Sequence, residues 1–222
     1  MLFKNIMLKS IIKSKKRVSD HGEVFTSGRE VNAMLDLVKQ ETERIDSRFL
    51  EPACGDGNFL SEILIRKLRI VKSRYGKSQN ELGKYSLVAI TSIYGIELLK
   101  DNVKKCRERL FEIYLEWYNV VLLPQQNDKL LDCVKFVLSK NIVHGDALTL
   151  KTIDENEKPI VFTEWSFTQN MVKRRGFSFD ELLKNQAIRD TPLFSDLGDD
   201  VFLPQAVEKF PLVHYLELAD NV

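Results

Sequence analysis

The chain has 222 residues, which is enough for one domain with a substantial buried core. Hydrophobic residues make up 44% and charged residues 29% of the sequence, as in ordinary globular proteins, and no apolar run approaches the length of a membrane span. The net charge of +1 excludes binding of nucleic acid through overall charge, so a site for a polyanion has to be a local patch.

The cysteines and the N-terminal segment indicate the cellular compartment. Cys54, Cys106 and Cys133 show neither metal-binding nor redox spacing, which predicts free thiols in a reducing cytoplasm and no metal site. Residues 1–17 mix lysines with apolar residues and lack the uninterrupted apolar stretch of a secretory signal. They form either a solvated amphipathic segment or an arm that contacts phosphates.

Helical and strand-like patterns alternate along the chain. The first half predicts a helix after a capping box at 27–30, a strand at 47–51, a helix at 59–71, a polar loop at 75–84 and a β-branched strand at 87–97. The second half predicts helices at 99–120 and 130–138, short strands at 141–145 and 159–162, a second capping box at 178–181 and a late strand at 211–218.

This alternation predicts an α/β fold with a mainly parallel sheet and helices on both faces. Ligands bind such sheets beyond the carboxyl ends of the strands. The residues that follow each apolar run are therefore the candidates for a site: 51–58, Glu97, Asp146 and 163–167.

The stretch after the first strand, "EPACGDGNFL", carries two closely spaced glycines. Gly55 and Gly57 permit a tight turn and a close approach of a ligand to the backbone, and the amides that open the next helix favour negative charge. Position 60 is leucine, so the third glycine of a dinucleotide site is missing. Glu51 and Asp56 bracket the turn with carboxylates, which suit a cationic ligand. The alternative is a tight connection without a ligand.

These letters resemble the Asp/Glu-Pro-x-x-Gly-x-Gly motif of class I, S-adenosylmethionine-dependent DNA methyltransferases, and in particular the adenine-N6 enzymes of restriction-modification systems. The resemblance spans roughly residues 21–150 and implies a three-layer, Rossmann-like methyltransferase domain with an N-terminal helical cover. It also implies S-adenosylmethionine as cofactor and DNA as partner. We expect residues 1–45 to form the basic segment and cover, and residues 46–222 the cofactor-binding domain.

The resemblance extends to other motifs of the family and assigns roles to their residues. In "HGEVFTSGREVNAML", Phe25 and Thr26 match a pair that touches the cofactor. Glu97 matches the acid that holds the ribose hydroxyls, and Asp146 matches the acceptor for the adenine amino group, with Leu148 near the ring. The expected cofactor-binding residues are Phe25, Thr26, Glu51, Ala53, Gly55, Asp56, Gly57, Asn58, Phe59, Glu97, Leu98, Asp146, Ala147 and Leu148.

The catalytic Asp/Asn-Pro-Pro-Tyr/Phe motif of the family does not occur in the sequence. "VFTEWSF" takes its place after the predicted fourth strand. There Glu164 would accept a hydrogen bond from the target amino group, and Trp165 or Phe167 would stack on an extruded base. The alternative is that the aromatic residues close the core and that Glu164 is exposed or salt-bridged.

The sequence therefore predicts an enzyme that methylates the adenine amino group of DNA, alone or with a partner subunit. The competing hypothesis is a non-catalytic subunit that binds S-adenosylmethionine or DNA. "MVKRRGF" at 171–177 is either a small nucleic-acid patch or a solvated loop, and the chain is too short to complete a seven-stranded sheet and add a recognition domain. The DNA sequence recognised and the oligomeric state have no signal in the sequence.

Overall fold

A computed structural model describes residues 26–122, 128–183 and 204–221. Its first sheet has the order β1-β2-β3-β4 and its second the order β5-β6-β7. The first sheet consists of β1 (Phe49–Glu51), β2 (Ile93–Glu97), β3 (Ile142–Asp146) and β4 (Lys151–Thr152). The second consists of β5 (Val161–Thr168), β6 (Met171–Ser178) and β7 (Glu208–His214). β1, β2 and β3 are parallel, as predicted, whereas β4 and the whole second sheet pair antiparallel.

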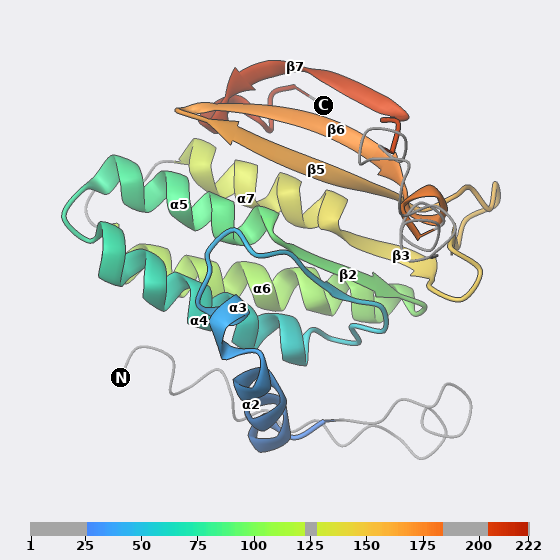
Figure 1. Ribbon diagram of the computed structural model, residues 1–222, viewed down its shortest axis with the longest axis horizontal. Helices are drawn as coiled ribbons and strands as arrows, with labels where there is room; N and C mark the ends of the chain where they lie inside the picture. Colours follow the sequence, from blue (N-terminus) through green and yellow to red (C-terminus); the bar gives the residue numbers. More distant parts are fainter. Residues whose placement is uncertain (1–25, 123–127, 184–203, 222) are drawn as a thin grey trace, which may run out of the picture.

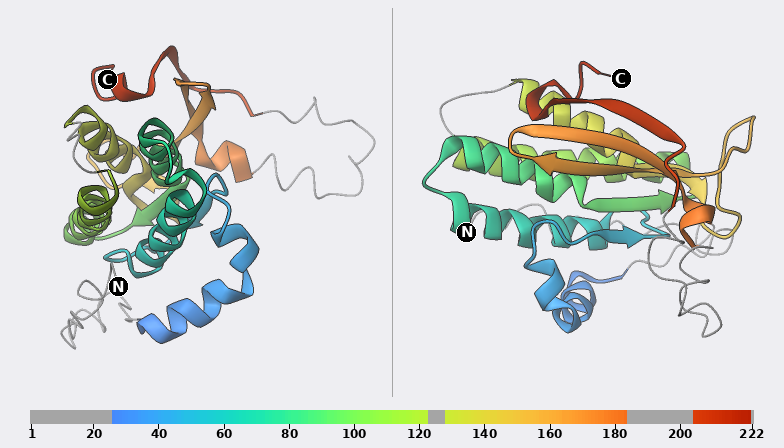
Figure 2. Two further views of the ribbon diagram at one scale, coloured as in Figure 1. Left: turned by 90° about the vertical axis from the view of Figure 1, so that its left-hand side faces the viewer. Right: turned by 45° about the horizontal axis from the view of Figure 1, so that its top comes forward.

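Four long helices form the bulk of the molecule and run alongside one another (Figures 1 and 2). They are α4 (Asn58–Tyr75), α5 (Gln79–Thr91), α6 (Lys100–Val121) and α7 (Asp128–Asn141). The shorter elements are α2 (Gly28–Leu37), α3 (Lys39–Thr42) and the 3-10 turn η3 (Tyr215–Glu217). Residues 179–183 form a further helical turn after β6, where the second capping box was predicted.

The two faces of β2 have different covers. Gly95 faces α4, because a Cβ atom there would lie 3.1 Å from the Leu60 side chain. Tyr94 faces the opposite way, where its ring meets Phe162 edge-on at 5.5 Å and its hydroxyl donates to the Thr163 carbonyl at 2.8 Å. The prediction of helices on both faces is therefore wrong for this side, which the β5–β6 hairpin covers (Figure 1).

The largest correction concerns residues 75–91. Instead of a loop followed by a long strand, α4 runs to Tyr75 and α5 continues to Thr91, so that only the last five residues of 87–97 form β2. Ser78 caps α5 by accepting from the Glu81 amide at 3.4 Å. A continuous apolar run is compatible with either a buried helix or a buried strand, and packing on all sides selects the helix here.

The predicted fourth parallel strand is also wrong. Ile160 packs against Gly145 at the carboxyl end of β3, and Trp165 donates to Asn141 just before the amino end of β3 at 2.9 Å. β5 therefore crosses the sheet face in the direction opposite to β3. Its partner β6 contains the segment 171–177, which is a strand and not a loop.

In the expected N-terminal cover, the described residues form the helices α2 and α3. Ser27 accepts from the Glu30 amide while the Glu30 carboxylate accepts from the Ser27 amide, which completes the predicted capping box. α2 is held on α4 by Arg66, which lies 2.8 Å from Asp36. The cover thus lies beside the helix that follows the glycine turn (Figure 1).

Lys67 of α4 is a cation in the protein interior with no exposed surface. Its ammonium donates to the Ile45 carbonyl at 3.1 Å, to the Ser92 hydroxyl at 2.6 Å and to the Ser47 carbonyl. Burial disfavours the charged form and lowers the pKa of Lys67 to about 7 from an ordinary value of 10.5.

The lowered pKa predicts a pH dependence of stability. Between about pH 7 and 10.5 the unfolded chain binds a proton at this amine and the folded chain does not, so stability rises with pH in this window. The free energy of unfolding of the wild type, relative to Lys67→Met, is expected to increase by about 2 kcal/mol from pH 7 to pH 9. Urea unfolding at both pH values measures this difference, and parallel pH profiles for the two proteins would contradict it.

Candidate functional site

The glycine turn lies at the carboxyl end of β1 and opens α4. Gly55 and Gly57 adopt positive φ angles of 55° and 91°, which explains the choice of glycine. The Cys54 amide donates to the Ile96 carbonyl at 3.0 Å and fixes the turn to β2. A Cβ atom at Gly57 would lie 2.8 Å from the sulfur of Cys106 on α6, so helix and turn are in close contact.

Glu97 organises the turn from the end of β2. Its carboxylate accepts from the Gly55 amide at 2.8 Å, from the Leu99 amide at 2.9 Å and from the Asn102 side chain at 3.3 Å. The residue is only 6% exposed. Glu51, the glycine turn and Glu97 therefore meet at one edge of the sheet, as the sequence predicted, although the bonds of Glu97 to the turn were not foreseen.

The turn is open at Gly55. A Cβ atom at Gly55 would meet nothing within 4 Å. Glu51 lies beside this space, and its partial burial raises the pKa of its carboxyl group, while a hydrogen bond from the Ala53 backbone opposes that shift. A half-buried carboxylate beside open backbone suits a cationic ligand.

Asp56 points away from this space, contrary to the expectation that it brackets a cation. Both of its carboxylate oxygens accept from Arg109 of α6, at 3.1 and 3.3 Å. Arg109 also donates to Asn58 at 2.8 Å, and Asn58 donates to the Thr26 carbonyl at 3.0 Å. This chain links α6, the turn and the N-terminal cover. Arg109 lies far from the motif in sequence and has no local signal of its own.

The Arg109–Asp56 pair predicts a stability effect. Arg109→Met leaves the Asp56 side chain, 8% exposed, without its counterion, and is expected to reduce the free energy of unfolding by about 3 kcal/mol. The double variant Arg109→Met/Asp56→Asn removes the orphaned charge and should recover part of that loss. Chemical denaturation of the singles and the double tests this, and additive losses would contradict the coupling.

Most of the other expected cofactor residues lie near the carboxyl ends of the parallel strands, and one lies outside the residues that the structure describes. Asp146 ends β3 and accepts from the Leu148 amide at 2.8 Å, while the side chain of Leu148 is 94% exposed. The Leu98 carbonyl lies 3.1 Å from His144, which connects the ends of β2 and β3. Ala147 and Phe59 are partly buried against the core. Phe25 lies outside the described residues.

The three expected catalytic residues do not converge on one point. Glu164 forms ion pairs with Arg48 at 3.1 Å and with Arg175 of β6. Trp165 is on the opposite face of β5, buried against Phe136 and hydrogen-bonded to Asn141. Since β5 runs toward the amino ends of the parallel strands, Phe167 lies farther still from the glycine turn. Their catalytic roles stay predictions.

A cavity of about 270 Å³ separates β1 and β2 from the hairpin. Phe49 and Leu50 of β1, the two residues before Glu51, line one wall. Glu164 and Thr163 line the other. The aromatic rings in its wall come from both sheets and from the turn after β6: Phe49, Tyr94, Phe162, Phe177 and Phe179. Aromatic walls with a carboxylate suit a flat heterocycle that carries a hydrogen-bond donor.

In the described ranges, no helix has the length and apolar character needed to cross a membrane, and no group of three or more potential ligands could hold a metal ion. A family model described as "MmeI, DNA-methyltransferase domain" matches residues 25–159, more than half of the chain. No curated protein and no solved structure matches the chain. The matched region contains the glycine turn, Glu97 and Asp146, and ends just before β5.

Proposed function

The chain belongs to the MmeI DNA-methyltransferase domain family, of the restriction-modification type, and on this basis we propose that it transfers a methyl group from S-adenosylmethionine to the N6 amino group of adenine in DNA. The observation that carries the cofactor assignment is the meeting of Glu51, Gly55 and Glu97 at one sheet edge. S-adenosylmethionine supplies a methyl group on a positively charged sulfur.

The proposed cofactor site uses the side of the turn that is open. Glu51 balances positive charge, and the amides at the start of α4 receive a carboxylate. Glu97 has three donors on its oxygens and about one acceptor position left, which a ribose hydroxyl would take. Asp146 would accept from the adenine amino group at the end of β3. Thr26 lies near enough to Asn58 to close the site from the cover.

The cavity beside β1 is the proposed site of the target base. Glu164 accepts a hydrogen bond from the amino group and orients its lone pair toward the methyl carbon. Bound S-adenosylmethionine would supply the methyl group and leave without it, and Glu164 can accept the proton that the methylated nitrogen releases. The rings of Phe162, Phe177 or Phe179, which line the cavity, would stack on the target base. Stacking by Trp165 or Phe167 would require a rearrangement of β5.

One observation favours the alternative of a non-catalytic subunit that binds cofactor or DNA. Glu164 is held by two arginines, and the sequence contains no Asn-Pro-Pro-Tyr. In that case, a partner subunit would contribute the missing catalytic groups. The cofactor site would be the same in both cases, so binding alone does not separate them.

Transfer of a labelled methyl group to unmethylated DNA tests the proposal. Wild type, Glu164→Gln and Phe177→Leu are compared with Phe111→Leu on α6, whose ring lies outside the cavity. Activity that depends on Glu164 and Phe177, with N6-methyladenine as the modified base, supports the enzyme. Cofactor binding without labelling, even after the addition of partner subunits, supports the non-catalytic alternative. N4-methylcytosine as the product would contradict the adenine assignment alone.

A further inference from the structure

The turn between α4 and α5 concentrates positive charge at the amino end of the parallel sheet. Residues 69–84 contain five basic side chains and one acidic side chain, Glu81. The basic residues are Arg69, Lys72, Arg74, Lys77 and Lys84. Because the whole chain has a net charge of only +1, this is a local patch and not a general property of the surface.

Three of these charges are not used inside the protein. Lys72, Arg74 and Lys77 are exposed, and none has an ion-pair partner among the residues that the structure describes. The bases of β6 differ: Arg174 is buried with its guanidinium 3.3 Å from the centre of the Phe210 ring, and Arg175 pairs with Glu164. Two of the three bases in the segment 171–177 therefore contact other side chains of the protein. Lys72, Arg74 and Lys77 at the α4–α5 turn are available to a ligand.

Aromatic and polar groups adjoin the patch. Tyr75 and Tyr85 stack with ring centres 3.7 Å apart, and Lys84 lies over Tyr85 at 5.4 Å. Lys84 and Tyr85 also line a second cavity of about 540 Å³, which reaches to Trp165. Cations beside aromatic rings and hydroxyl groups are typical of surfaces that hold nucleic acid.

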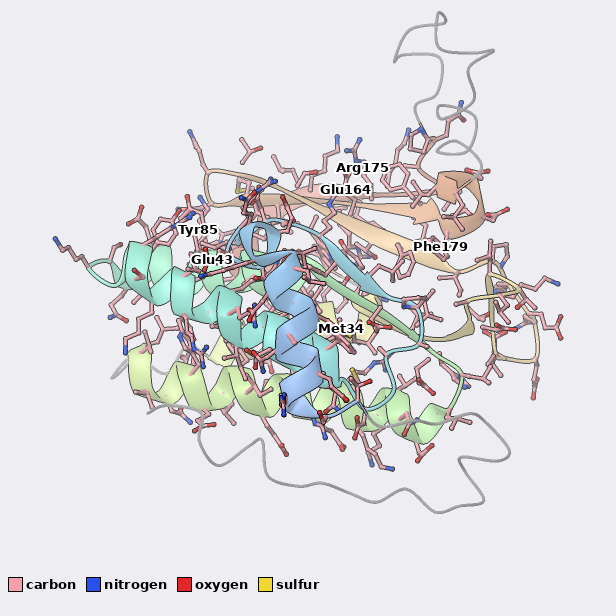
Figure 3. All side chains as sticks on the ribbon, turned by 60° about the horizontal axis from the view of Figure 1, so that its bottom comes forward. Met34, Glu43, Tyr85, Glu164, Arg175 and Phe179 are labelled. Carbon is pink, nitrogen blue, oxygen red and sulfur yellow. The ribbon has the colours of Figure 1, made fainter. Side chains whose placement is uncertain are left out.

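The patch is continuous with the proposed target-base cavity. Arg48 and Tyr94 line both cavities, which therefore adjoin and lead from β1 to Lys84 and Tyr85 of α5. The stacking of Tyr85 on Tyr75 connects this point to the end of α4. In Figure 3, Tyr85 lies toward one end of the molecule and Phe179 toward the other, with Glu164 and Arg175 between them. α4 spans about 27 Å from the glycine turn to Tyr75, which is the length of about 8 base pairs of duplex.

We propose that the α4–α5 turn binds the phosphate backbone of duplex DNA on one side of the target, within about 8 base pairs of it. Lys72, Arg74 and Lys77 contact phosphates, and Arg48 and Lys84 continue the path toward the target. The location of the target rests on the proposed function. Binding of the DNA backbone at the turn is inferred from the basic patch alone. Such contacts position the duplex and carry no sequence information.

Fluorescence anisotropy with labelled duplexes at several salt concentrations tests this. For the triple variant Lys72→Gln/Arg74→Gln/Lys77→Gln, we expect affinity for a duplex with long flanks to fall at least about tenfold, and the salt slope to decrease by about one per base removed. As the α7 control, the triple variant Lys104→Gln/Lys135→Gln/Lys140→Gln, with two lysines on α7 and one on α6, removes the same charge away from the turn and should bind as the wild type does. Duplexes with flanks of about 4 base pairs should not distinguish the proteins, because they are too short to reach the turn.

Equal affinity and salt slope for wild type and the α4–α5 variant would overturn the proposal, as would an equal loss in the α7 control. Calorimetry with S-adenosylmethionine should give the same affinity for all three proteins. If wild type shows the flank dependence but labels no DNA, the backbone contact stands and the catalytic proposal fails. The two inferences are therefore separable in one set of proteins.

Discussion

Glu97→Gln is expected to weaken S-adenosylmethionine binding by about 1–3 kcal/mol, or roughly 5- to 150-fold. The carboxylate accepts hydrogen bonds on both oxygens, from Gly55 on one and from Leu99 and Asn102 on the other. An amide keeps only one acceptor, so its NH₂ group must face one of these donors. The variant therefore loses both a ribose acceptor and the anchor of the turn. Titration calorimetry measures the affinity directly.

Glu164→Gln serves as the matched control, because it makes the same chemical change at a carboxylate outside the cofactor site. It should bind S-adenosylmethionine as the wild type does. NAD, the ligand of the competing dinucleotide site, should show no binding. Unchanged affinity in Glu97→Gln, or tighter binding of NAD than of S-adenosylmethionine, would disprove the cofactor assignment.

Gly57→Ala is expected to reduce the free energy of unfolding by about 2–4 kcal/mol, the sum of two penalties. The φ angle of 91° is unfavourable for any residue with a Cβ atom, and that atom would lie 2.8 Å from the Cys106 sulfur. The turn can respond only by separating from α6. Thermal or urea unfolding gives the loss, and weaker cofactor binding should accompany it.

Two further variants separate the penalties. At Gly55 the φ angle is 55°, but an added methyl group would meet nothing within 4 Å, so Gly55→Ala should cost only about 1 kcal/mol. Adding Cys106→Ala to Gly57→Ala should relieve the contact but not the backbone strain, so that the second substitution is less harmful than in the wild-type background. A Gly57→Ala protein as stable as Gly55→Ala would show that the turn is not confined by α6.

The part of the fold that the sequence predicts well is the part where local chemistry decides the structure. The capping box at Ser27, the glycines at 55 and 57 and the apolar stripe of α6 each specify their own element without help from distant residues. The site at the sheet edge followed from the same signals. Glu97 was predictable because it ends a buried run, and ends of parallel strands meet at one edge.

The parts that the sequence did not predict depend on partners distant in the chain. The run 87–91 is a helix because α4 and α7 pack against it, and its apolar residues alone fit a strand equally well. The local signal for a helix is the cap at Ser78, at the start of α5. The apolar run at the start of β5 fits a fourth parallel strand, and only its antiparallel pairing with β6 excludes that assignment. Arg109 and Lys67 lie on helices whose sequence pattern gives them no special role. Only the tertiary structure shows that Arg109 pairs with Asp56 and that Lys67 donates to carbonyl groups near β1.

The pairs β1–β2 and β5–β6 differ in how far apart the paired strands lie in the chain, and this has a consequence for the order of folding. β5 and β6 are joined by a tight turn, so their hairpin can form within microseconds. β1 reaches β2 only after α4 and α5 have formed the crossover between them, which carries a larger loop-closure entropy. Pulse-labelled hydrogen exchange should therefore detect protection of β5 and β6 amides before those of β1, with the sheet edge at Glu51 and Glu97 assembled last.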